Sequence, residues 1–352
     1  MFRPVHRCTG RFVCQDPFEE KRINAVKHSR RALAAALATS LSLSLPAPAE
    51  AQQLSSSPDF EALLARYAPG VDPEQVRALG VLLALLASVA IAIPMVKSGN
   101  VVSPDREHTH SLKVDGRSRT YDVVLPRGFS PEKSYPVVLG FGGWQHTSRQ
   151  MHDYARLESQ FPDAIVIYGQ GVRDAWGGAP YASTSVDEDV AYTKAVLDDV
   201  ASRYNADTSR TVAVGLSNGG GMVAALACHA PETVRGVASV AGAFYSPTVT
   251  GCTSGEVPTM IMHGTNDDVV GYNGGTRHGA SFQSVDTVAR TFARKNDCYL
   301  LTTQSRSAGV TTFDFVGCAE PVRIERVEGG GHTWFTSPDA TRQTAQFLRQ
   351  YL

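Results

Sequence analysis

Short apolar runs alternate with helical stretches from residue 108 to the end of the chain. Apolar residues at a helical period predict a helix over Val186–Tyr204, and two more helices are expected over Met222–Cys228 and Ala340–Tyr351. The near-continuous apolar runs between them are typical of buried strands. The expected strands are Tyr135–Leu139, Ala164–Tyr168, Thr211–Gly215, Val234–Val240, Thr259–His263 and Val322–Val327.

A hairpin is expected ahead of these strands. His110–Val114 and Arg119–Leu125 flank Asp115-Gly116, a dipeptide that favours a tight turn. Strands that alternate with helices argue for a parallel sheet, because parallel neighbours need crossover connections. The pattern therefore predicts an α/β fold for residues 108–352, with a mostly parallel central sheet and helices on both faces.

Residues 1–51 have the organisation of an export leader. A basic stretch that ends in Arg30 and Arg31 is followed by an uncharged run rich in Ala and Leu over 32–49. Ala49-Glu50-Ala51 then fits a small-x-small cleavage site, which would leave Gln52 as the first mature residue. We therefore expect the chain to be exported, either secreted or held in the cell envelope.

Residues 52–107 are expected to form a linker and a helical extension. Within this extension, residues 78–96 carry no charge and are just long enough to cross a bilayer. Three arrangements are open: a helix packed on the catalytic domain or a partner, a membrane-associated hairpin, or a true span. A true span conflicts with export, because it would leave the rest of the chain in the cytoplasm, where disulfides do not persist.

The charge of the chain is unevenly distributed. The formal net charge is -1, but basic residues are concentrated before residue 32, so the remainder is mildly acidic. A mildly acidic chain after residue 31 lacks the concentration of basic residues that a nucleic-acid-binding protein needs. We therefore expect no nucleic-acid partner.

Four cysteines remain if the leader, with Cys8 and Cys14, is removed. None of them has C-x-x-C spacing, so no zinc or redox site is expected. An even number in an exported protein suggests two disulfides, with sequential pairing as the simplest of the alternatives and four buried free thiols as the competing interpretation. The four are Cys228, Cys252, Cys298 and Cys318.

The segment Gly215-Leu216-Ser217-Asn218-Gly219 is a G-x-S-x-G motif between an expected strand and an expected helix. A nucleophile elbow needs this context, because small residues on both sides of the serine relieve crowding in a sharp turn. The N-terminus of the following helix also favours negative charge that develops at the site. We interpret Ser217 as a catalytic nucleophile rather than part of a glycine-rich structural turn.

A serine nucleophile needs a base, and the chain order Ser, Asp, His places that base after the last strand. His332, which follows a glycine run, fits better than His263 or His278. The orienting acid should follow the strand Thr259–His263, where we choose Asp267 over the adjacent Asp268.

The oxyanion of an acyl-transfer intermediate needs two donors. We expect the backbone amide of Asn218 to be one of them, and that of Gly143, in the glycine-rich loop after Tyr135–Leu139, to be the other. Aromatic residues near strand ends could line an acyl pocket, although such residues more often pack in the core. The candidates are Trp144, Tyr168, Trp176 and Trp334.

These residues together resemble the polyhydroxybutyrate depolymerase and feruloyl esterase group of α/β-hydrolases, which also includes acetylxylan esterases. The resemblance covers about residues 108–352 and implies an α/β-hydrolase fold, serine esterase activity and a triad of Ser217, Asp267 and His332. It also implies the disulfides Cys228–Cys252 and Cys298–Cys318. The motifs that carry it are Val186-Asp187-Glu188-Asp189-Val190-Ala191-Tyr192, Gly215-Leu216-Ser217-Asn218-Gly219-Gly220, His263-Gly264-Thr265-Asn266-Asp267 with Tyr272-Asn273-Gly274-Gly275, and Gly330-Gly331-His332-Thr333-Trp334.

The sequence departs from the family pattern at three positions. Phe141 stands where the family usually has a histidine, and Gly271 and Phe335 stand where it often has proline. We therefore expect a serine carboxylic-ester hydrolase without metal or cofactor that acts on a small-molecule or polymer ester. Acyl transfer or hydrolysis of an envelope lipid ester by the same residues, a peptidase, and a non-catalytic binding module on the same fold are the alternatives.

Overall fold

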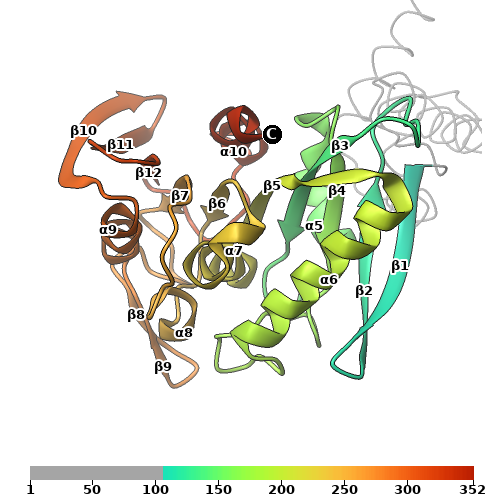
Figure 1. Ribbon diagram of the computed structural model, residues 1–352. Coiled ribbons are helices and arrows are strands. Elements are labelled where there is room, and N and C mark those ends of the chain that lie inside the picture. The colour runs from blue at the N-terminus through green and yellow to red at the C-terminus, as the bar shows by residue number, and fades with distance from the viewer. Residues whose placement is uncertain (1–105) are drawn as a thin grey trace, which may run out of the picture. The chain divides into compact units, whose positions relative to one another are not determined.

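A ten-stranded sheet organises the part of the chain that the computed structural model describes, residues 106–352 (Figure 1). Its strand order is β1-β2-β4-β3-β5-β6-β7-β12-β11-β10. The strands between β4 and β12 in this order run parallel, and antiparallel pairs complete both edges. The strands are β1 Glu107–Val114, β2 Arg117–Val124, β3 Tyr135–Phe141, β4 Ile165–Gly169, β5 Ala206–Leu216, β6 Val237–Val240, β7 Thr259–Gly264, β10 Tyr299–Ser307, β11 Val310–Val316 and β12 Val322–Val327.

Helices cover both faces of the sheet (Figure 1). One face packs against α6 (Val186–Tyr204), α7 (Asn218–His229) and α9 (Val285–Lys295), and the other packs against α5 (Ser148–Ala155) and α10 (Ala340–Leu348). Two large clusters of buried apolar side chains fill these layers, as in other α/β domains. The remaining elements are the short helix α8 Ser246–Val249, the hairpin strands β8 Gly275–Arg277 and β9 Ala280–Phe282, and single 3₁₀ turns at Leu157–Ser159, Pro231–Thr233 and Arg349–Tyr351.

This architecture confirms the predicted fold class. The hairpin of β1 and β2 turns at Asp115 and Gly116, which both have positive φ, as a tight turn between twisted strands requires. Helix α6 has the predicted bounds, and Ser185 caps it together with Glu188 in a capping box. The leader 1–51 and the segment 78–96 lie outside the described residues, as does nearly all of the extension 52–107.

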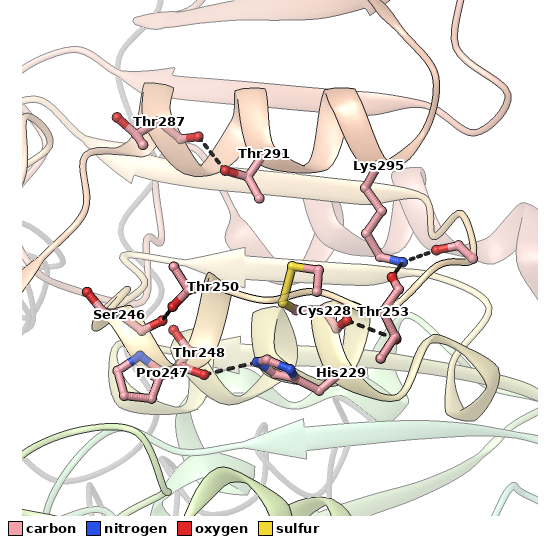
Figure 2. Close-up of a disulfide and its surroundings, with 12 residues drawn as sticks. Cys228, His229, Ser246, Pro247, Thr248, Thr250, Thr253, Thr287, Thr291 and Lys295 are labelled. Atoms are coloured by element: carbon pink, nitrogen blue, oxygen red, sulfur yellow. Dashed lines mark hydrogen bonds between the residues drawn. A yellow bond between two sulfur atoms is a disulfide. The ribbon is translucent and has the colours of Figure 1, made fainter.

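Two disulfides join the predicted cysteine pairs. Cys228 near the end of α7 is bonded to Cys252, and the backbone carbonyl of Cys228 also accepts a 2.8 Å hydrogen bond from the Thr253 amide (Figure 2). Lys295 of α9 donates to the Thr253 carbonyl at 2.9 Å. The bond therefore fixes the far end of α7 to the loop that leads into β7. The second disulfide joins Cys298 and Cys318, at the two ends of the β10–β11 hairpin.

Within residues 106–352, no helix combines the length and hydrophobicity that a membrane crossing requires.

Candidate active site

Ser217 occupies a sharp turn between β5 and α7. Its backbone has φ 55° and ψ −117°, a strained conformation for a residue that carries a side chain. The glycines on either side allow the turn, because a Cβ at Gly215 would lie 2.1 Å from the Gly219 carbonyl oxygen, and one at Gly219 would lie 2.1 Å from that of Phe141. This close approach lifts the Ser217 side chain above the carboxyl edge of the sheet, as in a nucleophile elbow.

The structure brings together the three side chains that the sequence singled out. His332 Nε2 lies 2.9 Å from Ser217 Oγ, and His332 Nδ1 lies 2.7 Å from Asp267 Oδ2. Since a carboxylate can only accept, Nδ1 carries the proton, and the lone pair of Nε2 faces the serine hydroxyl. The imidazole is thus oriented to remove a proton from Ser217.

Asp267 is buried, and both of its carboxylate oxygens accept hydrogen bonds. Oδ1 accepts from the backbone amides of Val269 at 2.9 Å and Val270 at 2.8 Å, and Oδ2 lies 3.2 Å from His263 Nε2 as well as facing His332. Burial alone would raise the pKa of this carboxyl, but the hydrogen bonds from His263, His332 and Val270 hold it well below its usual range. Asp267 is therefore ionised, whereas the alternative Asp268 is exposed to solvent.

The loops that carry the acid and the base are bound to each other. Asp267 follows β7 and His332 follows β12, which are parallel neighbours, so both loops leave the same edge of the sheet. A Cβ at Gly264 would lie 2.1 Å from the Gly330 carbonyl oxygen, which also accepts a 2.9 Å hydrogen bond from the Asn266 amide. This contact fixes the separation of the carboxylate and the imidazole.

Both expected oxyanion donors lie beside Ser217. Asn218 is the first residue of α7, and a Cβ at Gly143 would lie 3.3 Å from Ser217 Cβ. Trp176 holds the two segments together: its amide donates to Asn218 Oδ1 at 2.7 Å, its carbonyl accepts from Asn218 Nδ2 at 3.0 Å, and its indole donates to the Gly142 carbonyl at 3.0 Å. The two amides thus belong to a braced frame.

A pocket of about 370 Å³ opens over Ser217 and His332. Trp144 stacks on Tyr181 with ring centroids 4.3 Å apart, and Trp334 lines the pocket beside the base. A larger hollow of about 680 Å³ shares Tyr245 with this pocket but contains none of the three side chains above. Six further lining residues were not predicted from the sequence to belong to the site: His146, Tyr154, Tyr181, Tyr245, Arg277 and His278.

Sequence comparisons agree with this geometry. Residues 113–297 match the family model described as "Putative esterase". The chain belongs to this esterase family. It is 30% identical over 241 residues to feruloyl esterase C of Emericella nidulans, an alignment that covers 63% of this chain and 82% of that protein. It is 26% identical over 292 residues to feruloyl esterase D of Neurospora crassa, with 77% of this chain and 95% of that protein covered.

The fold of this esterase also occurs in solved structures. The acetyl xylan esterase of Aspergillus awamori superposes with a TM-score of 0.51 at 15% sequence identity, over 68% of this chain and 99% of that one. At this identity the likeness concerns the fold, which is the α/β-hydrolase fold. Together with the family match, these findings make the protein a carboxylic-ester hydrolase of the feruloyl esterase type.

Two aromatic residues that were expected to line the pocket lie elsewhere. Tyr168 is fully buried and its hydroxyl contacts Glu158 at 2.7 Å and the Leu157 amide at 2.8 Å. Trp176 is buried in the core with its edge on Phe141. Neither belongs to the pocket wall, because side chains alternate along the strand that carries Tyr168, and the Trp176 indole lies against the Gly142 carbonyl. The expectation was wrong for both, whereas Trp144 and Trp334 do line the pocket.

A histidine lines the pocket although position 141 carries phenylalanine. His146 lies five positions further along the chain and lines the pocket, with Nδ1 3.3 Å from the Tyr154 hydroxyl. Burial lowers the pKa of His146, and the charge of His332 lowers it further. Burial raises the pKa of Tyr154, and the nearby Gly143 backbone opposes that rise, so the phenol lies beside this expected donor. His146 and Tyr154 therefore supply polar groups beside Gly143 without a histidine at position 141.

Proposed function

We propose that Ser217, His332 and Asp267 hydrolyse the ester through an acyl-serine intermediate. The observation that carries the proposal is the continuous hydrogen-bonded chain from Ser217 Oγ through His332 to Asp267, with contacts of 2.9 and 2.7 Å. In the first half-reaction Oγ attacks the carbonyl carbon while His332 Nε2 takes the Oγ proton. His332 then donates this proton to the alcohol oxygen, and the bond between that oxygen and the acyl carbon breaks.

The second half-reaction reverses these roles. His332 takes a proton from a water molecule, the water oxygen attacks the acyl carbon, and the Ser217–acyl bond breaks as the proton returns to Oγ. Asp267 keeps its charge throughout and stabilises the imidazolium that forms twice. Its lowered pKa supports this role, because an ionised acid is available across the neutral range.

The backbone amides of Asn218 and Gly143 stabilise the oxyanion in both steps. Their position beside Ser217 and their bracing by Trp176 support this assignment, because preorganised donors need no reorientation as charge develops. The loss of one such donor costs about 2.7–4 kcal/mol in the transition state.

An ester with an aromatic acyl group is the substrate that the pocket supports best. Trp144, Trp334 and Tyr181 form broad apolar walls, and a pocket of about 370 Å³ has the size of a small-ligand site. Two relatives are named feruloyl esterases, and a feruloyl group is a planar aromatic acyl group of the kind that this pocket would hold. Short aliphatic acyl groups would leave much of this wall uncovered.

A panel of esters tests the proposal. Methyl ferulate, phenyl acetate, long-chain acyl esters and hydroxybutyrate oligomers should be compared by kcat/KM with protein that begins at Gln52. We expect the aromatic acyl ester to be preferred, and Ser217→Ala to reduce kcat/KM by about four or more orders of magnitude. Equal turnover by wild type and Ser217→Ala would contradict the assigned nucleophile.

We also infer that the protein is exported. Both disulfides, Cys228–Cys252 and Cys298–Cys318, belong to a class of bond that persists in oxidising compartments. Fractionation of cells that express the full chain, followed by N-terminal sequencing, should find mature protein that begins at Gln52 outside the cytoplasm. Deletion of residues 59–97 tests membrane or envelope association separately, because loss of that association should leave soluble-ester turnover intact.

A further inference from the structure

The pocket over Ser217 contains a single permanent charge. Arg277 lines it, and none of its lining residues within the described chain is Asp or Glu. Asp267 lies behind His332 and is not among the lining residues, and its oxygens already accept hydrogen bonds, so it forms no ion pair with Arg277. Arg277 is therefore the one permanent charge among the lining residues, and the hydrolysis of a neutral ester does not require it.

Arg277 ends β8 and leans towards the loop that carries the catalytic acid. Its Nε lies 3.3 Å from His278 Nε2, and its Nη1 lies 3.4 Å from the Val269 carbonyl oxygen. Both contacts are long for hydrogen bonds, so the guanidinium keeps most of its donor capacity. Arg277 forms no ion pair within residues 106–352. The arginines that do form ion pairs there include Arg117, Arg119, Arg149, Arg203, Arg210, Arg323 and Arg326.

Two tyrosines share the pocket with this guanidinium. Tyr181 and Tyr245 line the same pocket, and the charge of Arg277 opposes the rise that burial causes in the pKa of both phenols. His278 places its ring edge-on to Trp144 at 5.0 Å and to Tyr181 at 5.1 Å. The wall thus combines a cation with two phenol hydroxyls, a donor set that suits a carboxylate.

We infer that the substrate carries a carboxylate in addition to its ester, and that Arg277 binds this carboxylate. This inference rests on the proposed function, since it concerns the pocket of the same nucleophile. Arg277 is exposed, so water and salt screen its charge and a free anion would gain little there. A carboxylate that belongs to a bound ester is held beside the guanidinium, because the aromatic residues Trp144 and Tyr181 line the same pocket.

Binding to a protein that cannot turn over its ligand tests this inference directly. In a Ser217→Ala background, the tryptophan fluorescence is titrated with monophenyl adipate and with phenyl hexanoate, which differ by a terminal carboxylate. A second pair, 3-carboxyphenyl butyrate and phenyl butyrate, places the carboxylate on the alcohol side. We expect the anionic ester of at least one pair to bind about tenfold more tightly, and that pair identifies the side that faces Arg277.

Variants at position 277 identify the group responsible. Arg277→Gln should remove the tenfold preference and Arg277→Lys should retain part of it, since a lysine keeps the charge but not the planar fork. Arg290→Gln, on the exposed face of α9, is the matched control and should keep the full preference. Equal affinities within both pairs, or a preference that survives Arg277→Gln in a folded protein, would overturn the inference.

The proposed esterase function is tested by a different measurement from the one that tests the carboxylate site. Turnover of phenyl butyrate by protein with Ser217 intact tests the nucleophile without involving a carboxylate. A protein that hydrolyses this neutral ester but binds both members of each pair equally retains the proposed function and loses only the carboxylate site.

Discussion

Asp189 Oδ2 accepts a 2.6 Å hydrogen bond from the backbone amide of Gly177, the residue that follows Trp176. The other oxygen of Asp189 pairs with Arg119 at 2.8 Å, and both side chains are buried. Trp176 in turn holds Asn218 and the Gly142 carbonyl. A buried ion pair on β2 and α6 is thus connected to the frame of the expected oxyanion hole.

Asp189→Asn should destabilise the protein and weaken catalysis together. It leaves the guanidinium of Arg119 buried without a counter-charge, which typically costs about 3–5 kcal/mol. Chemical denaturation measures the stability, and kcat measured well below the unfolding midpoint measures the catalytic effect. The exposed Asp187→Asn is the control on the same helix. Equal stabilities for the two variants would contradict the role assigned to the buried pair.

Gly264→Ala should be far more harmful than Gly331→Ala. The new Cβ at position 264 would lie 2.1 Å from the Gly330 carbonyl oxygen, whereas nothing lies within 4 Å of a Cβ at position 331. The first substitution must push the loops of Asp267 and His332 apart, and thermal unfolding should reveal a lower midpoint. Similar midpoints for the two variants would show that the loop contact is dispensable.

His263→Leu should lower kcat and leave KM nearly unchanged. The imidazole of His263 contacts Asp267 Oδ2 at 3.2 Å and the Val270 carbonyl oxygen at 2.8 Å. A hydrogen bond to a charged group contributes about 1.5–3 kcal/mol, so a ten- to hundredfold loss in kcat is expected if the bond acts through Asp267. Steady-state kinetics on a soluble ester checks this, and a rise in KM alone would indicate a role in substrate binding instead.

Glu325→Gln should stabilise the protein above pH 7. Burial raises the pKa of Glu325 to about 7, and one of its carboxyl oxygens has no hydrogen-bond partner in the described part of the chain. The folded state therefore keeps a proton that the unfolded state releases near pH 4.3, and wild-type stability falls as the pH rises from about 4.3 to 7. The loss is on the order of 3 kcal/mol and should be absent from the variant.

Urea denaturation at pH 4 and pH 8 measures this difference. The gain of Glu325→Gln over wild type should be large at pH 8 and small at pH 4. Glu256→Gln, at an exposed position, controls for the general loss of a carboxylate. An equal gain at both pH values would show that the proton of Glu325 is not involved.

The sequence predicts the centre of this fold better than its edges. Strands β3, β5 and β7 are buried on both faces and carry the continuous apolar runs on which the prediction rests. Strand β10 was not predicted because it is exposed along its whole length, and after the three apolar residues Tyr299, Leu300 and Leu301 its sequence is polar without alternation. Helix α5 is only eight residues long, too short for a clear helical period.

The site likewise contains residues that sequence motifs mark and residues that no motif marks. Ser217, Asp267 and His332 follow strands in a fixed chain order, so local patterns were sufficient to single them out. Tyr154 and Arg277 belong to a helix and a hairpin with no motif, and only the folded chain brings them to the pocket. Tyr168 shows the reverse error, because proximity to a strand end does not tell which face its side chain occupies.

The formation of a covalent bond at Ser217 is the direct test of this residue as the nucleophile. Intact mass spectrometry and peptide mapping after treatment with a fluorophosphonate should find one adduct on Ser217. The adduct should be absent from Ser217→Ala and should form much more slowly in His332→Ala, because the hydroxyl then lacks its base. A folded wild-type protein that forms no adduct, or forms it on another residue, would contradict the assignment of Ser217 as the nucleophile.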